Sequence, residues 1–491
     1  MTATPVSLEQ LKEALPAQAD ARLSGSPVSG STYSERVIDH ITHDSRRVRA
    51  GSIFACVPGD RHDGHDFAQQ AIEAGAVALL VERPVSVDAP QLHVASVRRF
   101  LGPVSSAVFG HPSRLMRMVG VTGTNGKTTT THMVSHIAES VGLRPQIVGT
   151  LSGTRTTPEA PELHEMFRQF VDDGVDLVAM EVSSHGLDQH RTDGITFDVA
   201  TFTNLTVDHI DYHGTMTAYF EAKARLFEAA NARIAVVNID DEYGAQLARD
   251  ATIVVRPYER RDAHDIELFA TGSTWTWRGQ RVVLNVGGDF NISNALGAAT
   301  TMSALGLSDS DIAAGLGLLD RVDGRWDAVP CDLGFAVIVD YAHTPDGLDN
   351  VLTTARTVTP NGNVIVVFGC GGDRDRSKRA VMGASASRLA DVAIVTSDNP
   401  RSESPDAIIS DVVLGFQHDQ ARARTFVEVD RAAAIAMAID MAIAGDIVIL
   451  AGKGHERTQS IGSSVVPFDD RLVALGAIAA RGTRESGRAN A

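Results

Sequence analysis

The segment that most constrains the fold of this chain is Gly123-Thr-Asn-Gly-Lys-Thr128. It follows an apolar run from Leu115 to Val121 and precedes residues 129–137, which have a helical pattern. A strand, a glycine loop, Lys-Thr and a helix together form a phosphate-binding loop, in which backbone N–H groups and the helix N-terminus face the phosphates. The sequence therefore predicts that the chain binds a nucleoside triphosphate.

The glycine spacing of this loop departs from the strict pattern, because Val121 stands where the first glycine is expected. An ordinary glycine turn before a helix is the alternative interpretation. The Gly-Lys-Thr triplet at a strand-to-helix junction favours nucleotide binding. In that interpretation Lys127 neutralises the β- and γ-phosphates, and the Thr128 hydroxyl binds Mg²⁺.

Composition restricts the class of protein. A chain of 491 residues suggests about three domains. The net charge of −17 argues against a general binder of nucleic acid or anionic membranes, since either needs a basic face. Charged residues interrupt the N-terminal segment, no apolar run reaches about 18 residues, and the three cysteines lack metal-ligand spacing. We expect a cytoplasmic monomer without nucleic-acid partners or membrane insertion.

Short apolar runs alternate with helical patterns along most of the chain, which is typical of parallel sheets covered by helices on both faces. We expect an α/β protein of three domains: an α/β N-terminal domain (1–113), a central P-loop ATPase-like parallel sheet (114–327) and a Rossmann-like C-terminal domain (328–491). The polar tail from about residue 481 is expected to be disordered. The predicted strands are 52–57, 76–81, 177–182, 199–203, 233–238, 336–340, 364–368, 392–396 and 447–450, with an antiparallel hairpin over 273–286.

Polar segments follow the predicted strands, where ligands of doubly wound sheets bind. They are 181–191, 204–213, 340–346, 369–376, 398–401 and 452–456. Any single segment could be a structural loop, but six together favour a functional site. The segments near the phosphate loop hold possible cation ligands, and spacing alone leaves open which of them bind. These candidates are Glu181, Asp208, His209, Asp211 and His213.

Six motifs occur in order along the chain, namely 123–128, Glu181-Val-Ser-Ser-His185, Asp208-His209, Asn291-Ile-Ser-Asn294, Gly324-Arg325 and Asp340-Tyr-Ala-His343. In these motifs the chain resembles the Mur ligase family, the ATP-dependent amide ligases of peptidoglycan precursor synthesis. The resemblance runs from about Thr42 to Arg471, and the form of the phosphate loop is the family's own. It implies ATP and Mg²⁺ as cofactors and small-molecule substrates. The motifs are most similar to members that add meso-diaminopimelate to UDP-N-acetylmuramoyl-L-alanyl-D-glutamate.

The resemblance assigns roles around the phosphate loop. Nucleotide contacts are implied for Gly123, Thr124, Asn125, Gly126, Lys127, Thr128, Thr129, Asn291, Asn294, Arg325, Asp340 and His343. Metal ligands are implied at Thr128, Glu181, His209 and Lys223, and catalytic roles at Lys127, His209 and Lys223. Lys223 falls where the family carries a carbamylated lysine; without the resemblance it reads as a lysine on a helix surface.

The resemblance also implies contacts to the two other substrates. Contacts to the UDP-linked precursor are expected from His43, Ser45, Asp60, Arg61, His62, Arg155, Thr156, Thr157, Ser183, Gln189 and Arg191. Contacts to diaminopimelate are expected from Arg374, Asp398, Asn399, Pro400, Arg401, Gly452 and Glu456. Diaminopimelate and L-lysine differ by one distal carboxylate. The planar fork of an arginine matches a carboxylate and stays charged, so Arg401 is the expected reader of that group.

The implied reaction joins a carboxylate to an amine through an acyl phosphate made from ATP. The sequence identifies no general base for the attacking amine. A lysine-adding ligase and a folylpolyglutamate synthase are alternatives within the superfamily, and Arg401 and the first domain weigh against both. A P-loop ATPase or kinase is the alternative from another class, and it would release phosphate without an amine acceptor.

Overall fold

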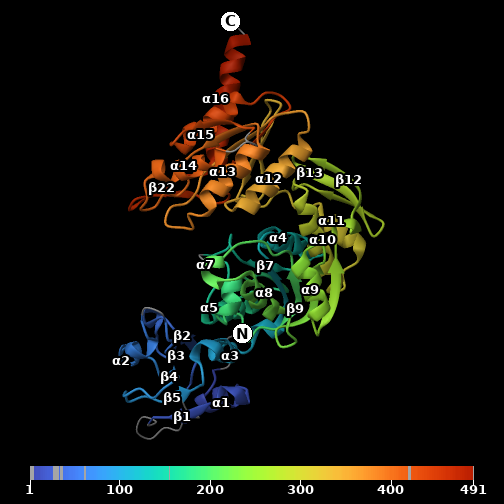
Figure 1. Ribbon diagram of the computed structural model, residues 1–491. Coiled ribbons are helices and arrows are strands. Elements are labelled where there is room, and N and C mark those ends of the chain that lie inside the picture. Colours follow the sequence, from blue (N-terminus) through green and yellow to red (C-terminus); the bar gives the residue numbers. More distant parts are fainter. Residues whose placement is uncertain are drawn as a thin grey trace.

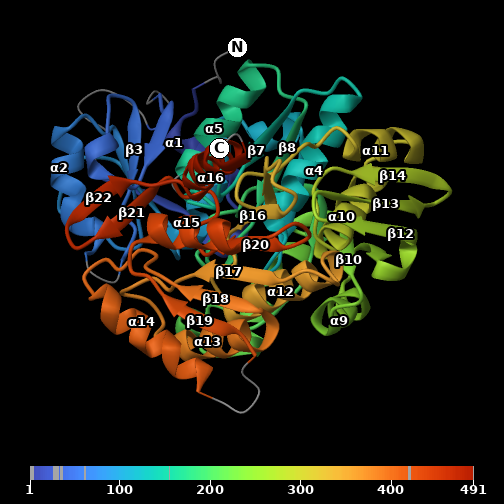
Figure 2. The same cartoon turned by 90° about the horizontal axis from the view of Figure 1, so that it is seen from above.

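The computed structural model describes residues 5–25, 33, 37–59, 62–153, 155–417 and 422–489. Three α/β units follow one another along the molecule, from the blue N-terminal unit through the green central unit to the orange and red C-terminal unit (Figure 1). Figure 2 views the same arrangement from above. The predicted α/β class with three sheet-containing units is therefore confirmed.

The first unit is a five-stranded sheet in the order β1-β5-β4-β3-β2, parallel except for the β1–β5 pair. Two of its strands are those that the sequence predicts at 52–57 and 76–81. The strands are β1 Arg22–Ser24, β2 His40–Thr42, β3 Ser52–Ala55, β4 Ala78–Val81 and β5 Gln91–His93, and the helices are α1 Leu8–Ala14, α2 Ala68–Glu73 and α3 Val97–Val108.

The central unit is a six-stranded sheet in the order β11-β10-β9-β6-β8-β7, and all of its pairs are parallel, as the sequence predicts. Its strands are β6 Arg117–Thr122, β7 Pro145–Val148, β8 Leu177–Glu181, β9 Phe197–Phe202, β10 Ala232–Asn238 and β11 Val254–Tyr258. Its helices are α4 Lys127–Ser140, α5 Ala160–Asp172, α6 Ser184–Asp188, α7 Ile210–His213, α8 Met216–Ala224, α9 Glu242–Asp250, α10 Phe290–Ala304 and α11 Asp309–Leu316.

The predicted hairpin belongs to a three-stranded antiparallel sheet of β12 His264–Phe269, β13 Gly272–Trp277 and β14 Gln280–Leu284. Buried Trp275 and Trp277 of β13 join the hydrophobic core that α4 and α10 form on one face of the central sheet. Figure 2 shows these strands at the edge of the molecule, beside α10 and α11. The small sheet therefore extends the core that carries the phosphate loop.

The third unit is a six-stranded sheet in the order β15-β16-β20-β17-β18-β19, parallel except for β15–β16. Its strands are β15 Asp327–Val329, β16 Ala336–Asp340, β17 Val364–Phe368, β18 Val392–Val395, β19 Arg424–Val427 and β20 Ile447–Ala451, with a hairpin of β21 Thr458–Ile461 and β22 Ser464–Pro467. Its helices are α12 Pro345–Val358, α13 Lys378–Leu389, α14 Pro405–Val413, α15 Arg431–Met441 and α16 Asp470–Ala489.

The C-terminal tail differs from its prediction as a disordered segment, because α16 continues to Ala489. Arg481 donates to the carbonyl oxygens of Ile439 and Ala442 near the end of α15 and pairs with Glu485 one turn further on. Polar composition suggested disorder, but these side chains find partners on the neighbouring helix and on their own.

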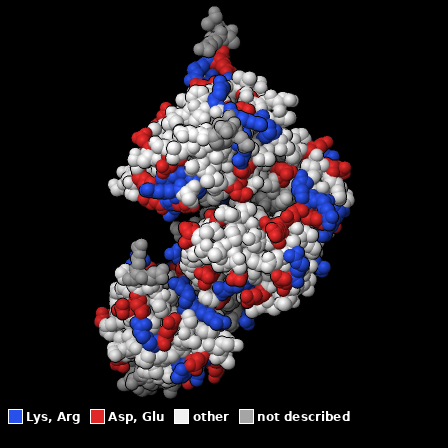
Figure 3. Space-filling model, viewed as in Figure 1, with Lys and Arg blue, Asp and Glu red and all other residues white. Residues whose placement is uncertain are grey.

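The surface agrees with the acidic composition. On the face shown in Figure 3, basic and acidic side chains of the described residues are interspersed, without a continuous basic area of the kind that nucleic-acid binding needs. Within the described residues, no helix combines the length and the apolar character that a membrane span requires.

Candidate active site

The phosphate loop occupies residues 123–126, between the end of β6 and the start of α4. Both of its glycines have left-handed backbone angles, with φ of 152° at Gly123 and 85° at Gly126. A Cβ atom would lie 1.9 Å from Thr203 Oγ1 at Gly123 and 2.3 Å from Asn294 Oδ1 at Gly126. No side chain caps the N-terminus of α4, so its first N–H groups remain available to an anion.

Two lysines converge on one carbonyl oxygen of this loop. Lys127 Nζ and Lys223 Nζ each donate to the oxygen of Gly123 at 2.8 Å, and Lys127 also donates to that of Thr124 at 2.8 Å. Lys223 is only 1% exposed and lies 4.6 Å from the centre of the Tyr219 ring. Burial, reinforced by the charge of Lys127, lowers the pKa of Lys223 well below its ordinary value. The interpretation of Lys223 as a surface lysine is wrong.

Glu181, the last residue of β8, is 1% exposed and lies beside the first turn of α4. Its carboxylate accepts hydrogen bonds from Thr128 Oγ1 at 3.1 Å, from Thr150 Oγ1 at 3.1 Å and from the Thr150 N–H at 2.8 Å. Thr150 was not among the predicted residues, because it follows β7, a strand that the sequence patterns did not reveal. Glu181 and Thr128 place hard oxygen donors at the phosphate loop.

A group of aromatic and imidazole rings surrounds His209, which has a left-handed backbone angle of 55° just before α7. Its ring lies 4.9 Å from the ring of His185, and its Nε2 lies 3.5 Å from Asp208 Oδ2. Burial lowers the pKa of His209, and burial together with His209 lowers that of His185 to about 4. These shifts disfavour protonation of the two rings, so their nitrogen lone pairs stay available to a hydrogen-bond donor or a cation.

The arrangement of possible ligands limits the kind of cation that the predicted metal site could hold. In the part of the chain that the structure describes, no group of three or more His, Cys, Asp or Glu side chains could hold a metal ion. Mg²⁺ commonly keeps several waters and uses one or two carboxylates together with phosphates, which fits the pairing of Glu181 with Thr128.

Three predicted nucleotide contacts, Arg325, Asp340 and His343, lie in the third unit or directly before its first strand. The Arg325 guanidinium stacks over the Tyr341 ring at 4.4 Å, and its Nη2 donates to Thr128 Oγ1 at 3.4 Å. Asp340 accepts from the N–H groups of Trp326 at 2.7 Å and Ala342 at 2.8 Å, and burial raises its pKa. The bond from Trp326 holds the end of β16 to the segment that carries Arg325, and Arg325 in turn reaches the first turn of α4.

His343 and Asp346 extend this contact. His343 Nδ1 donates to the Tyr341 carbonyl oxygen at 2.8 Å. Asp346, in the first turn of α12, accepts from Asn125 Nδ2 at 3.1 Å and Thr206 Oγ1 at 3.0 Å. Asp346 was not among the predicted residues.

Most of the predicted nucleotide residues line one cavity of about 310 Å³ between the central and third units. Asn291 has a different place, since it accepts from Asn294 Nδ2 at 2.8 Å and thereby orients the side chain that does line the cavity. The lining residues from the prediction are Thr124, Asn125, Gly126, Lys127, Thr128, Thr129, Thr156, Glu181, Ser183, His209, Lys223, Asn294, Arg325, Asp340 and His343.

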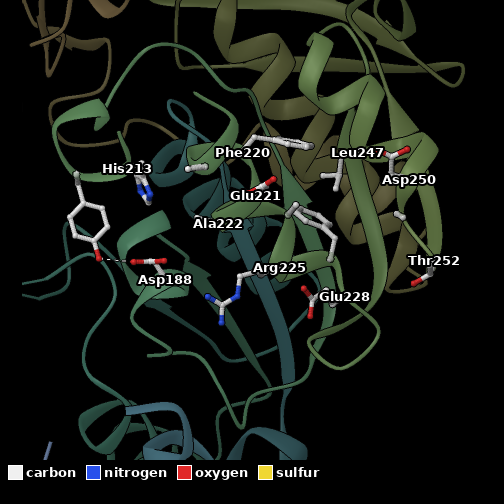
Figure 4. Close-up of a pocket in the computed structure, with 15 residues that line it drawn as sticks. Asp188, His213, Phe220, Glu221, Ala222, Arg225, Glu228, Leu247, Asp250 and Thr252 are labelled. Carbon is white, nitrogen blue, oxygen red and sulfur yellow. Dashed lines mark hydrogen bonds between the residues drawn. The ribbon is translucent and has the colours of Figure 1, made fainter. Parts of the chain in front are cut away.

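A second cavity, of about 760 Å³, lies between α8 and α9 (Figure 4). Figure 4 shows His213, Arg225 and Asp250 around it, and the Tyr212 hydroxyl donates to Asp188 at its edge at 2.7 Å. Its lining includes no residue of the phosphate loop. Of these two cavities, the phosphate loop lines the smaller one.

The predicted precursor residues of the central unit form a connected group beside Glu181. The Thr157 hydroxyl donates to the Glu181 carbonyl oxygen at 3.0 Å and accepts from Ser183 Oγ at 3.0 Å. Arg191 donates to the carbonyl oxygen of Thr157 at 2.9 Å and to Gln189 Oε1 at 2.6 Å. These bonds connect the precursor region to the end of β8.

The predicted precursor residues of the first unit are less connected. Ser45 begins a short helical turn beside His43, and the His62 ring packs against Phe67 at 6.3 Å. Asp60 and Arg61 lie outside the described residues.

The predicted diaminopimelate residues gather at the ends of β18 and β20. Asn399 Nδ2 donates to Glu456 Oε2 at 2.7 Å, and fully buried Lys453 donates to the same oxygen at 3.1 Å. Arg401 has a left-handed backbone angle of 50°, and its Nη1 donates to the carbonyl oxygen of Gly372 at 2.7 Å. Lys453 was missed, since a lysine in a glycine-rich segment gives no signal of burial.

The remaining residues of this group lie on the same loops. A Cβ atom at Gly452 would lie 2.7 Å from Asp398 Oδ2, so glycine permits their close approach. Pro400 joins Asn399 to Arg401, and Arg374 lies on the same loop as Gly372. The rings of Tyr341 and His455 lie 5.1 Å apart and connect this group to the nucleotide cavity.

The all-parallel sheet with a phosphate loop, covered by residues of a following α/β unit, defines a three-domain nucleotide-binding protein of the P-loop class. Comparisons with family models narrow this class. The Mur ligase family catalytic domain matches residues 37–109, the Mur ligase middle domain residues 121–302, and the Mur ligase glutamate ligase domain residues 324–454. The chain belongs to the Mur ligase family.

Two relatives cover nearly the whole chain. UDP-N-acetylmuramoyl-L-alanyl-D-glutamate–2,6-diaminopimelate ligase of Geobacillus kaustophilus is 44% identical over 89% of this chain and 94% of that protein. The ligase of the same name from Streptomyces coelicolor is 42% identical over 90% of this chain and 92% of its own.

Solved structures agree. A structure of a ligase bearing that same name has a TM-score of 0.69 at 30% identity and covers 98% of this chain and 100% of its own. MurF from Acinetobacter baumannii has a TM-score of 0.65 at 20% identity over 97% of this chain and 98% of its own, which supports the fold alone. The family prediction is confirmed, whereas the domain limits 1–113, 114–327 and 328–491 and the roles of single residues stay predictions.

Proposed function

We propose that this chain is an ATP-dependent amide ligase that adds meso-diaminopimelate to UDP-N-acetylmuramoyl-L-alanyl-D-glutamate in peptidoglycan precursor synthesis. The observation that carries the proposal is the single cavity in which the phosphate loop faces Arg325, Asp340 and His343. The names of the relatives at 39–44% identity support the choice of substrates. We further propose a monomer in the cytoplasm, which size-exclusion chromatography with light scattering and cell fractionation would test.

The proposed reaction has two steps. The D-glutamyl γ-carboxylate attacks the γ-phosphorus of ATP, so that an acyl phosphate forms and ADP leaves. The neutral amine of diaminopimelate then attacks the acyl carbon, and phosphate leaves from the tetrahedral intermediate. In the first step two anions approach each other. Lys127 and Arg325 both line the cavity, and their charges would offset that repulsion.

The oxygen donors at the phosphate loop fit a hard cation. Thr128 and Glu181 would hold Mg²⁺ there, with His209 and Lys223 lining the same cavity. When bound, the ion supplies positive charge beside the phosphates. Glu181 is already fixed by three hydrogen bonds from Thr128 and Thr150, so its carboxylate is positioned before any ligand arrives.

Release of ADP with different amino acids tests the proposal. With the precursor and ATP present, meso-diaminopimelate should accelerate ADP release strongly, and the product mass should increase by one diaminopimelate residue. L-Lysine in place of diaminopimelate separates the lysine-adding alternative. ADP release at the same rate without any amino acid would instead support an ATPase, and the proposal would fail.

We expect Lys223 to carry a carbamate in the active enzyme. Carbamate formation needs the neutral amine, which the lowered pKa of Lys223 provides. The modification would also place a negative charge beside Lys127, since both lysines approach the Gly123 carbonyl oxygen. Carbon-13 bicarbonate should give a carbamate NMR signal that is lost in Lys223→Ala. An active wild-type sample without this signal would disprove the modification.

A further inference from the structure

Glu159 stands at the centre of three arginines where the first unit meets the central unit. It immediately precedes α5 and is 5% exposed. Its Oε2 lies 2.7 Å from Arg98 Nη1, and its Oε1 lies 3.0 Å from Arg155 Nη1 and 3.0 Å from Arg191 Nε. Glu159 was not a predicted site residue, and neither was Arg98. One buried carboxylate thus joins two predicted precursor contacts to a helix of the first unit.

The charges of this cluster do not balance. Burial opposes ionisation of Glu159, but Arg191 and Arg98 outweigh burial and keep the pKa of Glu159 below its ordinary value. Three guanidinium groups therefore surround one carboxylate, with a surplus of positive charge. His43 lies close enough for the charge of Glu159 to act on it, and its Nδ1 is buried without a hydrogen-bond partner among the described residues. A cluster of this kind suits an anionic ligand.

The three arginines around Glu159 differ in how many other partners they have. Two nitrogens of Arg191 donate to the Thr157 carbonyl oxygen and to Gln189. Its buried Nε makes an ion pair with Glu159 and no hydrogen bond among the described residues. Arg155 is held only through Glu159, and its side chain is 55% exposed. Arg98 belongs to the first turn of α3 and so brings the first unit to the same carboxylate. Glu159 thus fixes the arginines without covering the exposed one.

We propose that Glu159 is a positioning residue for the UDP-linked precursor, which fixes Arg155 and Arg191 and joins them through Arg98 to the first unit. This inference rests on the proposed function, since Arg155 and Arg191 are the predicted contacts to the precursor. Loss of the carboxylate leaves three guanidinium groups that repel one another. Their displacement weakens binding of the anionic precursor and leaves the nucleotide and amino-acid sites intact.

The boundary between the first and central units also supplies a matched control. Arg47 of the first unit pairs with Glu162 at 3.0 Å and with Glu165 at 3.1 Å, both on α5. These ion pairs also join the two units, but their carboxylates are more exposed than that of Glu159. Among the described residues they form no ion pair or hydrogen bond with Arg155 or Arg191. Glu162→Gln therefore removes one carboxylate from this boundary and leaves all three ion pairs of Glu159 in place.

The test compares Glu159→Gln, Glu159→Asp, Arg98→Met and Glu162→Gln with wild type. Glu159→Gln should raise KM for the precursor about tenfold or more, as expected when one partner of a buried charge pair is removed. Its kcat and its KM values for ATP and diaminopimelate should stay at wild-type levels. Glu159→Asp should restore part of the loss, Arg98→Met should give a smaller increase, and Glu162→Gln should give none.

Calorimetric titration of wild type with the precursor comes first. If wild type binds and uses the precursor but Glu159→Gln keeps the wild-type KM, the inference is wrong and the proposed function stands. A parallel rise in all three KM values with a lowered Tm would assign Glu159 a purely structural role and also refute the inference. If Glu159→Gln does not fold, an unchanged precursor KM in Arg98→Met decides against it. Wild type without precursor binding refutes the function itself.

Discussion

Lys127→Ala is expected to lower kcat for ligation about 100- to 1,000-fold, the usual cost of removing one charge-stabilising donor from an active site. Lys127 is the cation of the phosphate loop, and its ammonium lies where it can neutralise transferring phosphate oxygens. Its two hydrogen bonds go to carbonyl oxygens of its own loop, and Lys223 still donates to the Gly123 oxygen after the change. The fold should therefore survive.

The control is Lys12→Ala, which removes an exposed lysine from α1, far from the phosphate loop in the sequence. Both variants should melt near the wild-type temperature, and Lys127→Ala should still bind the precursor. A folded Lys127→Ala enzyme that turns over near the wild-type rate would show that the nucleotide does not bind at this loop.

Arg401→Ala is expected to reduce kcat/KM for meso-diaminopimelate roughly 30-fold to several thousand-fold. Truncating one side of a buried charged pair costs about 2–5 kcal/mol, and here the distal carboxylate would lose its partner. Arg401 is preorganised for this task, because its Nη1 is fixed on the Gly372 carbonyl oxygen and its backbone pairs with Ser460. The loss should appear mainly in KM if the contact persists into the transition state.

L-Lysine lacks the distal carboxylate, so its kcat/KM should change little and the preference for diaminopimelate should narrow. KM for ATP and for the precursor should be unchanged. Arg376→Ala is the matched control, because Arg376 is an exposed arginine of the same region that pairs with Glu403 at 2.9 Å. An equal loss for both amino acids in Arg401→Ala would mean that Arg401 contacts a group they share.

The sheets were predictable because their strands are continuous apolar runs. Such runs are typical of strands in a parallel sheet that is buried on both faces. Strands β8, β9, β10, β16, β17, β18 and β20 all lie where these runs predict them. Strand β7 (Pro145–Val148) was not predictable, because it contains Pro145 and Gln146 and is only partly buried. Thr150, just beyond β7, was missed for the same reason.

The candidate site likewise has a part that the sequence predicts and a part that it does not. A motif within one segment, such as 123–128, is recognisable from the residue types and spacing of that segment alone. The burial of Lys223 depends on how α8 packs under a loop 100 positions away, and the bond from Asn125 to Asp346 spans 221 positions. Such contacts leave no local pattern in a single sequence. The contacts of Glu159 with Arg98 and Arg191, and that of Lys453 with Asn399, likewise join segments far apart in the sequence.

Transfer of oxygen from the precursor to phosphate tests the proposed reaction most directly. The D-glutamyl γ-carboxylate of the precursor is labelled with oxygen-18, and the enzyme turns over with ATP and meso-diaminopimelate. An acyl phosphate requires that one labelled oxygen leave with the phosphorus, so the released phosphate should carry one oxygen-18 while the labelled tripeptide product accumulates. Unlabelled phosphate released together with the ligated product would contradict activation of this carboxylate by ATP.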